Sequence, residues 1–133
     1  MKGYNDNIET LTTANEDFRR VLYTGDHLQL VLMTLQPGEE IGSEVHDGID
    51  QFFRFEEGEG VVDIDGVANE VEDGSGVIVP SGARHNVRNT GKTPLKLYSI
   101  YGPPEHQDQV VQATKADAEA RHADEEFDGK TTE

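Results

Sequence analysis

The feature that most constrains the fold is a series of short apolar segments, separated by glycine-rich turns at nearly regular spacing between residues 18 and 104. Residues 61–65 and 67–71, for example, flank Asp65-Gly66, a dipeptide typical of a two-residue hairpin turn. Many short strands with such turns favour a β-sandwich or barrel. The sequence therefore predicts an all-β domain over residues 18–104, preceded by an extended lead-in segment over residues 1–17.

The most apolar of these segments, residues 28–35, predicts a strand that is covered on both sides. Its side chains form two apolar sets: Leu28, Leu30 and Leu32 on one face, and Val31, Met33 and Leu35 on the other. Apolar residues on both faces indicate that both are buried. One face fills the barrel, and the other needs a second sheet, the lead-in segment or a partner chain. Cover by a partner is the basis for predicting a homodimer.

Four polar side chains in two separate stretches are candidate metal ligands. A ligand-bearing strand is expected over residues 39–45. Glu44 and His46 are two residues apart, so in an extended chain they point to the same face. Gln51 follows after a short turn, and His85 follows the turn-rich residues 80–84. A lone histidine or glutamine near a strand end is more often solvated or capping, so the interpretation rests on the set. One carboxylate, two imidazoles and an amide carbonyl suit a divalent transition metal.

Two aromatic side chains are predicted to line the same cavity. Gln51, Phe53 and Phe55 share a parity in the strand expected over residues 51–57, so the amide and both rings should point inward together. Such rings make a dry wall, which strengthens electrostatic interactions around a metal. The alternative is that Phe53 and Phe55 only fill the core.

The two stretches that hold these residues resemble the two motifs of the cupin superfamily. In the first, five residues separate Gly38 from Glu44-Val45-His46, four more lead to Gln51, and six more lead to Gly58. The second stretch fits the second cupin motif at every position: Gly74, Pro80, Gly82, His85 and Asn89. The resemblance implies a small single-domain cupin, with the jelly-roll barrel also called a double-stranded β-helix over residues 18–104.

The resemblance also implies which residues hold a metal. Cupins commonly use three histidines and one glutamate; here Glu44 stands at the place of the first histidine and Gln51 at the place of the glutamate. The implied ligands are thus Glu44, His46, Gln51 and His85, and the implied cofactor is one divalent transition metal: zinc, manganese, iron or nickel. No residue is identified as catalytic; Tyr98, Tyr101 and Asp50 are the candidates that could reach the cavity mouth.

Residues 105–133 differ in composition and are predicted to form an acidic C-terminal tail. Thr114 with Asp117 is a candidate N-terminal helix cap, and residues 116–126 have high helix propensity without a strong apolar stripe. We therefore predict a short surface helix there and a loose end over 128–133. His106 and His122 are assigned to solvent, with the alternative that one of them caps the cavity.

Charge and composition exclude several classes of partner. The 133 residues carry a net charge of −16, which disfavours nucleic acid and anionic membrane surfaces. No apolar run is as long as a membrane span, and the first residues carry no apolar signal region, so a cytoplasmic protein is expected. Without cysteine, any metal must be held by nitrogen and oxygen atoms.

Three functions compete for such a site, each acting on or binding a small molecule. The first is a metal-dependent isomerase or lyase acting on a sugar or hydroxy-carbonyl compound, because the ligand types resemble those of the cupin mannose-6-phosphate isomerases. The second is an iron-dependent dioxygenase, because Glu44, His46 and His85 form a set of two histidines and one carboxylate. The third is a binding or sensing module without catalysis. We rank the isomerase first.

Overall fold

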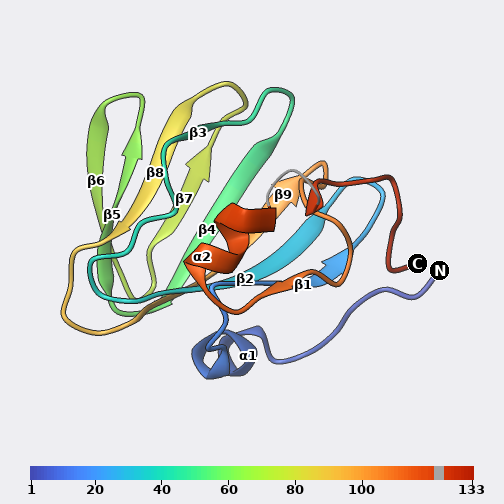
Figure 1. The fold of residues 1–133 in the computed structure, drawn as a ribbon, viewed down its shortest axis with the longest axis horizontal. Helices are drawn as coiled ribbons and strands as arrows, with labels where there is room; N and C mark the ends of the chain where they lie inside the picture. The colour runs from blue at the N-terminus through green and yellow to red at the C-terminus, as the bar shows by residue number, and fades with distance from the viewer. Residues whose placement is uncertain (122–124) are drawn as a thin grey trace.

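The computed structural model describes residues 1–121 and 125–133, and it consists of two antiparallel sheets that face each other (Figure 1). Within the described residues, the larger sheet has the strand order β10 (Val111–Gln112), β1 (Arg19–Thr24), β2 (Gln29–Leu35), β9 (Leu95–Gly102), β4 (Asp50–Glu57), β7 (Gly76–Val79). The smaller sheet has the order β3 (Glu44–Val45), β8 (Arg84–Asn89), β5 (Glu59–Ile64), β6 (Val67–Glu72). This arrangement confirms the predicted all-β jelly-roll fold.

The core lies between the two sheets. In β4 the inward parity predicted from the sequence is confirmed, because Gln51, Phe53 and Phe55 are buried while Phe52 and Arg54 are partly exposed. Apolar side chains from both sheets meet these rings and are fully buried: Val31, Met33, Val62, Val87, Leu95 and Leu97. Hydrophobic burial between the two sheets therefore holds the sandwich together.

The predicted extended lead-in segment is wrong, because residues 8–14 form a helix, α1 (Ile8–Ala14). Its N-cap is Asn7, whose side-chain oxygen accepts a hydrogen bond of 2.9 Å from the backbone N–H of Thr10. The helix packs against β2, β4 and β9 on the outer side of the larger sheet. Part of the outer face of β2 is therefore covered by the N-terminal segment, one of the three covers considered above. The homodimer stays a prediction.

The strand predicted over residues 39–45 is shorter than expected. Only Glu44 and Val45 form β3, and Glu40 pairs with Arg88 as an isolated bridge. Between them Gly42 has a φ of 109°, far outside the extended conformation, and its N–H donates to the side chain of Asn86 at 2.9 Å. The predicted Asp65-Gly66 turn does join β5 and β6, with φ angles of 45° and 82° as a primed hairpin turn requires.

The C-terminal tail contains the predicted helix as α2 (Lys115–Arg121), and residues 125 and 126 of the predicted helical stretch lie outside it. The hydroxyl of Thr114 accepts from the N–H of Asp117 at 3.1 Å, which is the predicted cap. The prediction for His122 lies outside the described residues. The prediction of a loose chain end is wrong, because Thr132 is hydrogen-bonded to Thr24. The Thr132 hydroxyl accepts from the N–H of Thr24 at 2.8 Å, and the Thr132 N–H donates to the Thr24 carbonyl at 2.8 Å.

In the part of the chain that the structure describes, no helix has the length and apolar character needed to cross a membrane.

Candidate metal centre

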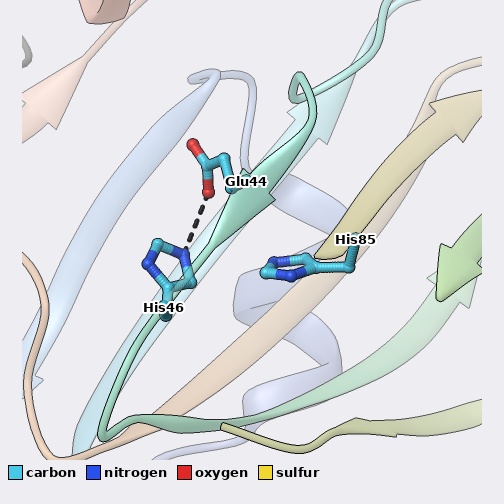
Figure 2. Close-up of side chains that lie close together, drawn as sticks. All are labelled: Glu44, His46 and His85. Carbon is cyan, nitrogen blue, oxygen red and sulfur yellow. Dashed lines mark ion pairs between the residues drawn. The ribbon is translucent and has the colours of Figure 1, made fainter. Parts of the chain in front are cut away.

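Strand register brings Glu44 and His85 together. In the antiparallel pair of β3 and β8, Glu44 lies directly opposite His85. His46 follows β3 immediately, two residues beyond Glu44. One ligand atom from each of these three side chains lies within 4.8 Å of the others. Figure 2 shows the carboxylate and both imidazoles gathered beside β3 and β8. We call Glu44, His46 and His85 the ligand triad.

Glu44 and His46 approach each other as two ligands of one ion would. Nε2 of His46 lies 3.0 Å from Oε2 of Glu44, yet this buried nitrogen has no partner with hydrogen-bond geometry. Two ligand atoms bonded to one ion at about 2.1 Å, and at right angles, lie about 3.0 Å apart. The separation and the missing hydrogen bond therefore fit a shared metal between the two side chains.

His85 is held in the tautomer that a metal needs. Its Nδ1 lies 3.2 Å from the backbone carbonyl of Ala83. A carbonyl oxygen only accepts, so Nδ1 carries the proton and donates it. Nε2 is then the unprotonated nitrogen, with its lone pair free to bind a metal. The orientation of the His85 ring is therefore set by Ala83, only two residues earlier in the chain.

His46 has a carboxylate on its other side. Its Nδ1 lies 3.7 Å from Oε1 of Glu105, an ion-pair distance longer than a hydrogen bond. The order carboxylate, imidazole, metal is common at metal sites, because the outer carboxylate orients the ring and raises its basicity. Both histidines of the ligand triad therefore have an oxygen atom facing the nitrogen that would not bind the metal.

A buried glutamine fixes the segment that carries Glu105. Oε1 of Gln29 accepts from the backbone N–H groups of Glu105 and His106, at 3.1 and 3.0 Å. Its Nε2 donates to the carbonyl of His106 at 2.7 Å and to the hydroxyl of Thr24 at 2.9 Å. Gln29 is itself fully buried. Three of these bonds attach residues 105 and 106 to β2 and place the Glu105 carboxylate near His46, and the fourth joins Gln29 to β1.

The prediction that His106 lies in solvent is wrong, because this side chain is only 6% exposed. Its Nε2 lies 3.3 Å from the hydroxyl of Tyr101, and the Tyr101 ring in turn lies 6.0 Å from that of His46. One sequence signal could have indicated this packing: Gln29 is a polar residue at the inward parity of an apolar strand. A buried polar side chain there needs partners from a distant part of the chain.

The electrostatics of the ligand triad keep Glu44 and His85 in their metal-binding forms and make a proton compete with the metal at His46. Burial would raise the pKa of Glu44, but the His46 imidazole and the charge of Arg19 outweigh it, so the pKa is lowered and the carboxylate is ionised. Burial lowers the pKa of His85, which keeps that ring neutral. Burial would also lower the pKa of His46, but the carboxylates of Glu44 and Glu105 raise it. A proton bound to His46 must therefore leave when a metal binds.

Comparison with known proteins agrees with this fold. A family model described as a cupin domain matches residues 31–101, more than half of the chain. The chain belongs to the cupin family. It is 49% identical over 120 residues to the uncharacterized protein YrkC of Bacillus subtilis, and 37% identical over 105 residues to the uncharacterized protein L612 of Acanthamoeba polyphaga mimivirus. The matches cover 86% and 75% of this chain, and 64% and 65% of the two relatives, so this cupin spans about two thirds of their length.

A solved structure is also similar over nearly the whole chain. The crystal structure of BH2720 from Bacillus halodurans is 50% identical to this cupin, with a TM-score of 0.88, covering 90% of this chain and 95% of that one. The likeness extends beyond residues 31–101, so the segments outside the cupin motifs share the architecture as well.

Gln51, the fourth predicted ligand of this cupin, lies opposite Tyr101 in the pairing of β4 with β9. It is 3% exposed, and its Nε2 donates to the hydroxyl of Ser99 at 2.9 Å. Its Oε1, the atom that would bind a metal, is buried without a hydrogen-bond partner. An amide carbonyl left unpaired in this way is costly unless something else satisfies it. The role of Gln51 as a ligand stays a prediction.

Replacing Gln51 with alanine should weaken metal binding by about tenfold or less, because a neutral amide contributes no charge to the site. The measurement is calorimetric titration of chelator-treated protein with Mn²⁺ or Zn²⁺. Ser99→Ala is the matched control, since it removes the hydroxyl that positions the Gln51 amide but no candidate ligand. A loss as large as that of a histidine variant would contradict the secondary role.

The other predicted pocket residues occupy different positions. The ring of Phe53 lies 6.3 Å from that of His85, and the Phe55 ring lies 6.3 Å from that of Phe53. Of the three candidates for the cavity mouth, Tyr101 contacts His46, whereas Tyr98 lies beside Phe52 on the outer face of the sheet. The third, Asp50, accepts a hydrogen bond from the N–H of Ser81 at 2.8 Å and so supports the turn before β8.

Proposed function

We propose that this cupin binds one divalent transition metal through the ligand triad and acts as an isomerase or lyase on a small hydroxy-carbonyl compound. The observation that carries the proposal is the approach of His46 to Glu44: Nε2 of His46 is buried, lies 3.0 Å from Oε2 of Glu44, and has no partner in hydrogen-bond geometry. Two neutral imidazoles and one carboxylate leave a 2+ ion with a net positive charge. Three protein ligands also leave coordination positions for water and substrate.

The bound ion would act as a Lewis acid that polarises a hydroxyl or carbonyl oxygen. The protein supports this chemistry through its own residues. The Ala83 carbonyl fixes the His85 tautomer, and Glu105 orients His46. Phe53 forms an apolar wall beside His85 that excludes water from this side. Burial raises the pKa of Tyr101, so its hydroxyl keeps its proton at neutral pH and can donate a hydrogen bond but not remove a proton.

A second candidate function, an iron-dependent dioxygenase, is favoured by the composition of the ligand triad. Two histidines and one carboxylate with open positions form the set that non-haem Fe(II) oxygenases use. The same three residues thus support oxygen chemistry if the resident metal is iron, and isomerase or lyase chemistry if it is zinc, manganese or nickel.

Elemental analysis of the protein, purified from its own host without added metal or chelator, tests these alternatives. We expect about one metal per chain in the wild type and a large loss in Glu44→Ala. Zinc, manganese or nickel supports the isomerase or lyase. Iron, together with oxygen uptake during aerobic turnover, would replace it with the dioxygenase. No metal in the wild type, and none taken up on titration, would overturn both and favour a binding module.

A further inference from the structure

A second polar feature lies next to the ligand triad. A cavity of ≈ 290 Å³ opens between β1, residues 41–44 and α2, and Glu44 is one of its lining residues. Figure 1 shows α2 beside the chain that leads into β3. The other polar residues that line the cavity are Arg19, Ser43, Lys115 and Glu119. We call it the Arg19 cavity. Because Glu44 belongs to both the ligand triad and the Arg19 cavity, a molecule in this cavity lies beside the candidate metal centre.

The Arg19 side chain is a buried cation whose hydrogen bonds are incomplete. It is 5% exposed, and Nη1 donates to the neutral amide oxygen of Gln112 at 2.7 Å. Its guanidinium carbon lies 5.3 Å from the centre of the Phe18 ring. Nε is buried and has no hydrogen-bond partner. A buried charge is costly unless an opposite charge pairs with it, so this guanidinium can bind an anion that the described residues do not supply.

The position of Arg19 in β1 directs its charge toward the ligand triad. In the larger sheet Arg19 pairs with Met33 of β2, whose side chain is in the core, so both side chains point between the sheets. Its charge acts on Glu44, His46 and Tyr101. Among the described residues no carboxylate lies within ion-pair distance of Arg19. Lys115, the other cation of the cavity, lies 3.8 Å from Glu119 and is already paired.

We infer that Arg19 binds the carboxylate of the substrate, which is therefore a small 2-hydroxy or 2-oxo carboxylic acid. The planar guanidinium matches a carboxylate, and the adjacent hydroxyl or carbonyl oxygen then lies on the side of Glu44 and the metal. Among the described residues that line the cavity, Arg19 is the one cation that no carboxylate pairs, and it lies beside the carboxylates of Glu44 and Glu119. This balance favours a monoanion over a phosphate dianion. This inference rests on the proposed metal function and names the substrate class for it.

The test uses glycolate as the probe, with its neutral methyl ester and inorganic phosphate for comparison. Dissociation constants are measured by calorimetry or NMR titration on the full chain, with and without Mn²⁺. Arg19→Met should weaken glycolate binding by roughly 10- to 100-fold, because a hydrogen-bonded charge is lost, and should leave methyl glycolate binding unchanged. Arg19→Lys, which keeps the charge without the planar fork, should give an intermediate loss and serves if Arg19→Met does not fold. Arg20→Met is the matched control and should change binding less than threefold, because Arg20 is the exposed neighbour of Arg19 in β1 and does not line this cavity.

The outcomes separate this inference from the proposed function. If Mn²⁺ binds to the wild type and to Arg19→Met alike, while Arg19 makes no difference to glycolate, the inference fails and the metal site stands. If no metal binds but glycolate binding still depends on Arg19, the metal function fails and the carboxylate site stands. Tighter binding of phosphate than of glycolate, or a loss in Arg20→Met as large as that in Arg19→Met, would overturn the assignment.

Discussion

Replacing His85 with alanine is expected to abolish high-affinity binding of a divalent metal. The ligand triad has only two imidazoles, and His85 is the one whose tautomer is fixed by the chain, through the Ala83 carbonyl at 3.2 Å. Loss of a supporting partner alone costs about 10- to 100-fold in metal affinity, so loss of a ligand should exceed 100-fold. The measurement is calorimetric titration of chelator-treated protein with Zn²⁺ or Mn²⁺.

His27→Ala is the matched control, because His27 is an exposed histidine in the turn before β2 and lies outside the ligand triad. A thermal scan adds an independent readout. Metal at 100 times its dissociation constant should stabilise the wild type and His27→Ala by about 2.7 kcal/mol, and should leave His85→Ala unchanged. Full metal occupancy in a folded His85→Ala protein would show that the metal binds elsewhere.

The ligand triad could be predicted because its geometry is local to two motifs. Glu44 and His46 are two residues apart, and His85 follows the Pro80 to Gly82 turn that begins β8. Each spacing determines which face of a strand the side chains point to, and a few consecutive residues are enough to encode it. The jelly-roll fold then pairs β3 with β8, and Glu44 meets His85.

The surroundings of the ligand triad could not be predicted, because they come from distant parts of the chain. Arg19, Gln29 and Glu105 reach it only when β1, β2 and the segment after β9 assemble around the sandwich. No short motif carries that information. Two local errors have local causes: the Asn7 cap allows a helix of only seven residues, and the positive φ of Gly42 interrupts the strand expected before Glu44.

Replacing Gln29 with leucine is expected to produce a large loss of stability, by releasing the segment that carries Glu105. Leucine fills the space of the buried side chain but makes none of its four hydrogen bonds. The N–H groups of Glu105 and His106, and the His106 carbonyl, then lose their partner in the interior. Each buried group left unpaired costs about 1–3 kcal/mol, so we expect a loss of about 3 kcal/mol or more in the free energy of unfolding. Urea denaturation followed by circular dichroism measures it.

The same substitution should also weaken metal binding, because His46 loses the carboxylate that faces its Nδ1 at 3.7 Å. We expect a loss of about 10- to 100-fold in metal affinity, smaller than that of His85→Ala.

Gln36→Leu is the matched control, since it makes the same change at an exposed glutamine just after the same strand. It should leave the free energy of unfolding and the metal affinity at their wild-type values. Glu105→Gln separates the two effects, because it removes the carboxylate charge and keeps the Gln29 bonds. It should weaken metal binding while preserving most of the stability. If the urea midpoint of unfolding is the same for Gln29→Leu as for the wild type, Gln29 does not hold the segment that carries Glu105. If it is unstable but binds metal with wild-type affinity, the placement of Glu105 beside His46 has no part in metal binding.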